Sequence, residues 1–221
     1  MAAAHHVIGL QHLMDPGDAK LIVVIGRARE VAETDLALTT EQGIGFFRSH
    51  AFILRGWALA EQGQCEEGIA EVLDGLAAYR ALGADLESSH WLALLAEAYG
   101  DWGRPAEGLS LITEALDHVA QTDIVYYEAE LHRLHGELRL RLDALDEQRA
   151  ETSFQRALEI ARVQEAKSWE LRAATSLARL WGQQGRRAEA HDLLTPVYGW
   201  FTEGFNTQDL KAAKALLDKL A

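Results

Sequence analysis

Apolar and small residues recur along this chain at intervals of three and four, which is the spacing of one face of an α-helix. Three segments with this pattern align without gaps: RGWALAEQGQCEEGIAEVLDGL (55–76), LAEAYGDWGRPAEGLSLITEAL (95–116) and LARLWGQQGRRAEAHDLLTPVY (177–198). Each segment reaches a glycine, then four polar or turn-forming residues, then a second apolar face; the glycines are Gly63, Gly103 and Gly185. Because glycine ends a helix at little conformational cost, the pattern predicts two helices joined by a short turn.

A fourth copy, LHGELRLRLDALDEQRAETSFQRALEIA (134–161), fits if two additional residues enter its turn around 143–148. Small residues of the second helices then recur about every 40 residues, at Gly68, Gly108, Ala150 and Ala190. Small residues of the first helices recur in step, at Gly56, Ala96, Gly136 and Ala178. They would let paired helices approach closely, and self-similarity at this period is typical of a solenoid.

The two ends of the chain are less regular than the repeats. Residues 1–43 fit a degraded helical pair, and we expect the run KLIVVIG (20–26) to be helical because a lone strand would lack a partner. The segment 208–221, QDLKAAKALLDKLA, has one apolar stripe and a lysine-bearing face, which predicts an amphipathic helix capped by Asn206 or Thr207.

These patterns predict an all-α fold, a right-handed solenoid of helix-turn-helix repeats with a C-terminal capping helix. We expect a single domain over residues 1–221. Its predicted parts are the degraded pair 1–43, the repeats 44–83, 84–123, 124–168 and 169–205, and the capping helix 206–221.

An aromatic segment, YGWFTEGFNTQDL (198–210), separates the last repeat from the capping helix. Pro196 cannot donate a backbone hydrogen bond, so we expect a kink in the last repeat's second helix, and Gly204 should break the helix. The aromatic side chains would then cover the exposed apolar end of the repeats. This hypothesis requires that Trp200 and Phe205 are not both largely exposed to solvent.

The spacing in LAEAYGDWGRPAEGLSLITEAL resembles the tetratricopeptide repeat, although the period here is about 40 residues and the family's is about 34. The phrases AEGLSLITEAL, YYEAELHRLHGEL and YGWFTEGF resemble the C-terminal repeat region of bacterial multidomain signalling proteins. In those proteins a class III adenylate/guanylate cyclase domain precedes a P-loop ATPase domain. The resemblance covers residues 31–221 and is most specific in the last 90 or so.

The catalytic motifs of that family are absent from this sequence. It contains no G-x-x-x-x-G-K-[ST] phosphate-binding loop and no pair of metal-binding aspartates in a cyclase-like strand context. We therefore expect a non-catalytic chain that needs no cofactor. It would be either a fragment of such a signalling protein or a stand-alone relative of its tail.

Composition excludes several further classes. A formal net charge of −13 disfavours binding to nucleic acid or to an anionic membrane surface. The single cysteine, Cys65, allows no internal disulfide and no multi-cysteine zinc site, and we expect a cytoplasmic protein. The N-terminus lacks the pattern of a signal peptide, and the apolar run LIVVIG (21–26) is too short to span a bilayer.

Several residues could carry chemistry, but a structural role is the favoured interpretation for each. Glu128, His132 and His135 share a helical face and could hold zinc in a hydrolase or metal enzyme, although surface residues of a repeat helix show the same spacing. Cys65 has no nearby base to activate it. Most of the six tryptophans recur at repeat-equivalent positions, which indicates packing, and three further histidines lie near the start of the chain: His5, His6 and His12. We therefore expect no metal site.

The residues most suited to binding lie on the first helix of each pair, which lines the concave groove in tetratricopeptide-like stacks. One predicted row consists of His50, His90, Glu130 and Arg172. A second row consists of Trp57, Glu97, Glu137 and Arg179, with Arg133 and Thr175 between the rows. The groove would be acidic in its middle and basic toward its C-terminal end, although a merely solvated helix face would give the same pattern.

A groove of this kind suits a charged peptide segment or a neighbouring domain of the same parent protein. The predicted function is a non-catalytic module for protein–protein interaction or regulation within a bacterial cyclase/ATPase-type signalling protein. The alternative is a domain of such a regulator that senses a small-molecule inducer.

Overall fold

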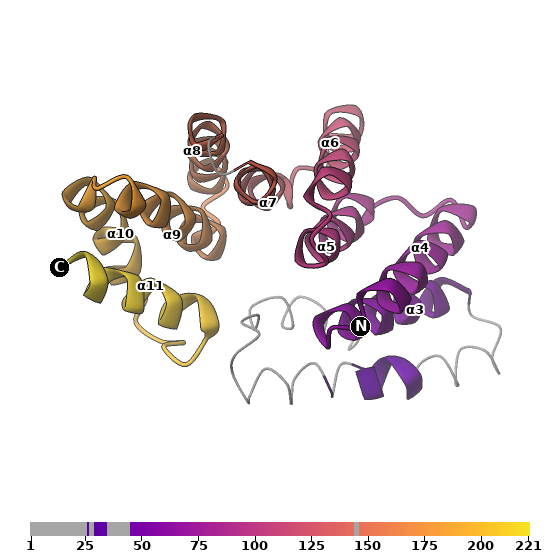
Figure 1. Ribbon diagram of the computed structural model, residues 1–221. Helices are drawn as coiled ribbons and strands as arrows, with labels where there is room; N and C mark the ends of the chain where they lie inside the picture. The colour runs from indigo at the N-terminus through magenta and orange to yellow at the C-terminus, as the bar shows by residue number, and fades with distance from the viewer. Residues whose placement is uncertain (1–25, 27–28, 35–44, 144–145) are drawn as a thin grey trace. The chain divides into compact units, whose positions relative to one another are not determined.

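The computed structural model describes residues 26, 29–34, 45–143 and 146–221 (Figure 1). The chain divides into two compact units, the first containing the described residues up to Ile124 and the second those from Val125 onward. Each unit is described by itself. Most of the predicted pair over 1–43, and all of the run 20–26 except Gly26, lie outside the described residues.

Helices joined by short turns account for both units, and the described residues contain no strand. The first unit contains a helical stretch at 29–34 and the helices α3 (Gly45–Glu61), α4 (Cys65–Ala81), α5 (Ser88–Asp101) and α6 (Pro105–Thr122). The second contains α7 (Glu128–Leu142), α8 (Glu147–Val163), α9 (Lys167–Gln183), α10 (Arg187–Gly199) and α11 (Gln208–Leu220).

The helices pack in the pairs that the repeat predicts: α3 with α4, α5 with α6, α7 with α8, and α9 with α10 (Figure 1). First helices also contact each other within each unit, α3 with α5 and α7 with α9. The helix α11 lies against α9 and α10, where a capping helix was expected.

Left-handed residues end the helices, as the turn glycines predicted. Gly63, Gly103 and Gly185 have φ angles of 83°, 78° and 81°, which glycine adopts without the penalty of a Cβ. Where the helices α6 and α8 end, the chain has no glycine, and Asp123 (φ 62°) and Glu165 (φ 54°) take this conformation. Pro105 opens α6, where its missing N–H costs nothing.

Small residues bring the paired helices into backbone contact. A Cβ added to Gly56 of α3 would lie 2.5 Å from the carbonyl oxygen of Gly68 and 2.8 Å from the amide nitrogen of Val72 in α4. In the α7–α8 pair, a Cβ on Gly136 would meet the ring of Phe154 at 2.5 Å. The large apolar residues that the pattern placed between helices are buried there: Val72, Ile112, Phe154 and Leu194.

The aromatic segment before α11 differs from its prediction. Trp200 is 57% exposed and Phe205 is 49% exposed, so the hypothesis that these side chains are buried over the end of the repeats is wrong. The helix α10 continues through Pro196 to Gly199, and Thr207 is the N-cap residue of α11. Two other aromatics of the segment, Tyr198 and Phe201, are partly buried against this core, as expected. The helix α11 covers the same core through Leu210, Ala213 and Leu220.

Backbone contact between α3 and α4 predicts that Gly68→Ala destabilises the first unit. Alanine is a better helix former than glycine by up to about 1 kcal/mol, so a net loss would identify the steric cause. We expect a loss of about 2 kcal/mol in the free energy of unfolding, measured by urea titration with circular dichroism.

The matched control is Gly45→Ala in α3, where a Cβ would meet only the side chain of Leu82 at 3.6 Å, an ordinary van der Waals distance. This control should not lose stability. Equal effects of the two substitutions would contradict the backbone-contact interpretation.

Candidate functional site

The histidines of the predicted rows are enclosed by the first unit. Nδ1 of His50 lies 2.9 Å from the carbonyl oxygen of Phe46, and its Nε2 lies 2.6 Å from the carboxylate of Glu87. This hydrogen bond from His50 holds the pKa of Glu87 below its ordinary value. His90 is buried and stacks on Trp91, and burial lowers its pKa to about 4. A neutral, enclosed His90 offers no charge to a partner.

The other two predicted residues of the first unit differ in exposure. Trp57 is 4% exposed and belongs to the core, so its side chain serves packing. Glu97 is half-buried and belongs to an acidic group with Glu61 and Asp101 at the ends of α3 and α5. Burial, together with the charges of Glu97 and Asp101, raises the pKa of Glu61 to about 8.

The predicted residues of the second unit come together in a network of charges between α7 and α9. The carboxylate of Glu130, only 2% exposed, accepts two hydrogen bonds from Arg133, at 2.7 and 2.9 Å. A guanidinium nitrogen of Arg172 on α9 lies 3.0 Å from the same carboxylate. Buried carboxylates require such partners, so these three side chains connect the two helices.

Glu137 extends this network by one turn of α7. Its carboxylate accepts a hydrogen bond from the Ser176 hydroxyl at 2.7 Å and another from Arg179 at 3.4 Å, and it lies 3.6 Å from Arg133. Burial acts to raise the pKa of Glu137, but the charges of Arg133, Arg179 and Arg141 and the hydrogen bond from Ser176 together leave the pKa below its ordinary value. Glu137 is therefore ionised at neutral pH.

The remaining predicted residue, Thr175, is buried. Its hydroxyl donates to the carbonyl oxygen of Leu171 at 2.7 Å within α9. It takes no part in the charge network.

A pocket of about 340 Å³ opens beside Glu137, and we call it the α7–α9 pocket. Its polar lining includes two predicted residues, Glu137 and Arg179, together with Arg141, Glu147, Ser176 and Gln183. The carboxylate of Glu147 accepts a hydrogen bond from Gln184 at 2.8 Å. The volume is at the lower end of the range for ligand pockets and suits a few side chains of a partner.

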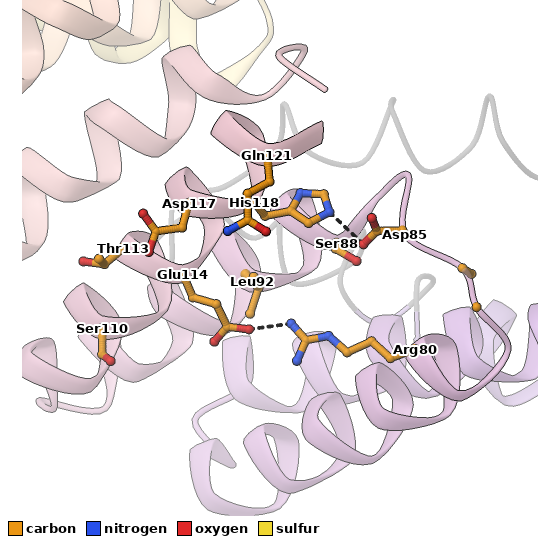
Figure 2. A pocket seen from close by; sticks show the side chains of 12 residues that line it. Arg80, Asp85, Ser88, Leu92, Ser110, Thr113, Glu114, Asp117, His118 and Gln121 are labelled. Carbon is orange, nitrogen blue, oxygen red and sulfur yellow. Dashed lines mark hydrogen bonds and ion pairs between the residues drawn. The ribbon is translucent and has the colours of Figure 1, made fainter. Parts of the chain in front are cut away.

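A larger pocket of about 890 Å³ lies in the first unit, between α4, the start of α5 and α6 (Figure 2). We call it the α4–α6 pocket. Its charged lining residues are Arg80, Asp85, Glu114 and Asp117, and His118 also lines it. Arg80 pairs with Glu114 at 2.6 Å, and Nε2 of His118 lies 2.7 Å from Asp85.

None of the residues predicted from the sequence lines the α4–α6 pocket. The predicted binding rows lie on first helices, whereas most residues that line this pocket belong to the second helices α4 and α6 or to the α4–α5 connection. A signal was present in the polar residues that recur at helical spacing along α6, namely Ser110, Thr113, Glu114, Asp117, His118 and Gln121. On its own, this spacing is indistinguishable from a solvated helix face.

The residues considered for metal binding have other partners in the structure. Nδ1 of His135 lies 2.9 Å from the Ser153 hydroxyl, and Arg139 donates to its Nε2 at 3.3 Å. Nε2 of His132 lies 4.0 Å from Glu128, and burial lowers its pKa to about 4. Within the described residues, no three His, Cys, Asp or Glu side chains are arranged to hold a metal ion.

The structure also bears on two other functions, a reactive cysteine and a membrane-spanning helix. Burial and the charge of Asp101 raise the pKa of the Cys65 thiol, which disfavours the reactive thiolate. No helix in the described part of the chain is long and apolar enough to cross a membrane. The histidines His5, His6 and His12 lie outside the described residues.

Comparison with known proteins identifies the fold. No family model matches the chain. An uncharacterized protein of Rhizobium meliloti (strain 1021) is 30% identical over 130 residues, which are 59% of this chain and 12% of that protein. The chain therefore spans only a small part of this curated relative.

Two solved structures are similar over 90% of this chain. BtubC from P. vanneervenii has a TM-score of 0.65 at 17% identity, with 87% of its chain covered. The apo form of RapI has a TM-score of 0.61 at 13% identity, with 54% covered. At these identities the likeness concerns the fold alone, and it confirms the predicted fold class, an all-α solenoid of helical repeats.

The raised pKa of Glu61 predicts how the stability of the first unit depends on pH. In the unfolded chain this carboxyl ionises above its ordinary pKa of 4.5, whereas in the folded chain it keeps its proton up to about pH 8. Folding therefore takes up a proton between these values, and stability falls as the pH rises through this window. Glu61→Gln should raise the free energy of unfolding at pH 8 by about 1 kcal/mol or more and leave it nearly unchanged at pH 4.5.

Thermal unfolding at the two pH values measures this effect. Asp74→Asn, an equal change of charge at an exposed position of α4, is the control. If both variants respond to pH in the same way, the stabilisation comes from general charge reduction and the assignment to Glu61 is wrong.

Proposed function

We propose that this chain is a non-catalytic protein-interaction module and that the α7–α9 pocket binds an acidic side chain of a partner segment. The proposal rests on the charge network between α7 and α9. Its carboxylates, Glu130 and Glu137, already accept hydrogen bonds from the protein's own donors. Its outer cation, Arg179, has a side chain exposed to solvent.

Arg179 is the residue best placed for recognition. Its side chain is 49% exposed, and it contacts Glu137 through one nitrogen at 3.4 Å. A guanidinium has five N–H donors in a planar fork that matches a carboxylate, so a partner's carboxylate can bind in bidentate fashion. Arg141, also exposed, lines the same pocket and adds positive charge.

The fold supports this proposal in general terms. Stacked helical pairs present extended surfaces whose residues come from successive repeats, and such surfaces suit segments of other proteins. A partner could be a separate protein or another domain of the same parent chain.

We also propose that the module belongs to a bacterial signalling protein of the cyclase/ATPase type and works in the reducing cytoplasm. The support is the resemblance of the C-terminal phrases to that family and the R. meliloti relative, in which the matching region is a small part of a much longer chain. Reading the gene around this segment tests the proposal. A P-loop motif and cyclase aspartates in the same reading frame are expected, and a frame without them would contradict it.

Arg179→Gln is the substitution that tests the binding proposal. A peptide array in which acidic, basic and neutral side chains are placed at each position should select acidic peptides. We expect the variant to weaken binding of the selected peptide about fivefold, measured by fluorescence anisotropy with a labelled copy, since an exposed charge pair contributes up to about 1 kcal/mol.

The control is Arg149→Gln, an equal change of charge on α8 at a side chain that is 74% exposed. It should change the affinity by less than about twofold on the same scale. Equal losses in the two variants, or an array without acidic selection, would contradict the assignment to the α7–α9 pocket.

A further inference from the structure

We propose that the α4–α6 pocket is a second binding site, which takes a lysine or arginine side chain from a basic peptide segment. The inference rests on the proposed interaction function and names a different surface and the opposite partner charge. Two observations in this pocket support it. The pocket contains buried polar atoms that have no hydrogen-bond partner, and its carboxylates outnumber its cations.

An ion pair and a hydrogen-bonded pair connect the walls of the pocket (Figure 2). On one side Arg80 of α4 pairs with Glu114 of α6 at 2.6 Å. On the other side Asp85, in the α4–α5 connection, pairs with His118 of α6 at 2.7 Å. These pairs hold the walls together, and Ser88 at the start of α5 also lines the pocket.

The floor of the pocket contains two buried polar atoms whose hydrogen-bonding capacity is unused. Ser88 is 1% exposed and lines the pocket, and its Oγ has no hydrogen-bond partner among the described residues. The same holds for Nδ1 of His118 within the described part of the chain. The hydroxyl oxygen of Ser88 can therefore accept a hydrogen bond from a donor group of a ligand.

The charges of the lining point to the same class of ligand. Asp85, Glu114 and Asp117 bring three carboxylates, whereas Arg80 brings one permanent cation that is already paired with Glu114. No ion pair of Asp117 occurs among the described side chains, and this carboxylate is exposed at the pocket. An anionic ligand would face this surplus of negative charge, whereas an ammonium or guanidinium group would neutralise it.

The size of the pocket favours a peptide over an isolated cation. A volume of about 890 Å³ is at the upper end of the range for ligand pockets and exceeds what a single cation needs. Beyond Asp117, the side chains of Ser110, Thr113 and Gln121 line the pocket and can hydrogen-bond with a peptide backbone (Figure 2). The net charge of −13 also draws basic segments toward the protein by long-range attraction.

Fluorescence anisotropy with a defined probe tests the proposal on the full chain. The probe is a fluorescein-labelled peptide of alternating glycine and arginine, and its matched control replaces each arginine by citrulline, which keeps the shape and removes the charge. We expect the arginine probe to bind and the citrulline probe to bind at least tenfold more weakly, on the order of a lost charge-assisted hydrogen bond.

Variants then assign the binding to the pocket. Asp117→Asn should weaken the arginine probe about fivefold, whereas Asp192→Asn should change its affinity less than twofold. Asp192 is on α10, and its side chain is 87% exposed. Its substitution removes the same charge as Asp117→Asn at a position that does not line the pocket. Ser88→Ala should weaken binding without lowering the melting temperature, because the hydroxyl removed has no partner in the described protein.

Three outcomes would overturn the proposal. Equal losses in the Asp117 and Asp192 variants would show attraction to the whole acidic surface only. Equal binding of the citrulline probe would exclude recognition of a cation. If spermidine binds with the same dependence on Asp117 while the arginine peptide does not bind, the ligand is a free polyamine and the peptide source is wrong.

The failure of this inference is separable from the failure of the proposed function. The acidic peptide and Arg179 report on the second unit, whereas the arginine probe and Asp117 report on the first. Binding that depends on Arg179 but not on Asp117 would overturn this inference alone.

Discussion

Close approach of paired helices at small residues is the constraint on which the rest of the structure depends. At the α3–α4 crossing neither Gly56 nor Gly68 could carry a Cβ without overlap with main-chain atoms of the partner helix. At the α7–α8 crossing, Gly136 receives the ring of Phe154 in place of a backbone. One face of each first helix is therefore occupied by its partner, and polar residues must lie on the faces that remain.

The faces of a first helix that its paired helix does not cover contact other first helices. Polar residues on these faces therefore come together, which explains the charge network. Because α7 contacts α9, Glu130 and Arg172 are held within 3.0 Å of each other. A buried ion pair contributes little net stability because both charges lose their hydration, but removal of one partner leaves an uncompensated charge. The inner part of the predicted rows thus fixes how the two helices meet, and only the outer part, around Arg179, is available for recognition.

The sequence was informative where a residue's role depends on its near neighbours. The helix pairs, the turns at Gly63, Gly103 and Gly185, and the buried positions of Phe154 and its equivalents all follow from spacing within one repeat. Exposure of Trp200 and Phe205 was predicted incorrectly because it depends on where α11 packs, which no local pattern specifies.

The binding residues were predictable only in part for the same reason. The helical register placed Glu130, Glu137 and Arg179 on related faces, but distances between helices decide that the first two are engaged with the protein's own donors. The α4–α6 pocket depends on the approach of α4 to α6, and its residues look like a solvated face when each helix is considered alone.

The acidic residues of the first unit show how the protein treats a carboxylate that no arginine neutralises. Glu61, crowded by Glu97 and Asp101, keeps its proton up to about pH 8 and so adds no charge at neutral pH. Asp85 lies in hydrogen-bond contact with His118, and Asp117 remains exposed to water beside it. Protonation, pairing and hydration are the three ways to accommodate such a group. Only the hydrated carboxylate keeps its charge available, which is why a cationic partner should bind at Asp117 and not at Glu61.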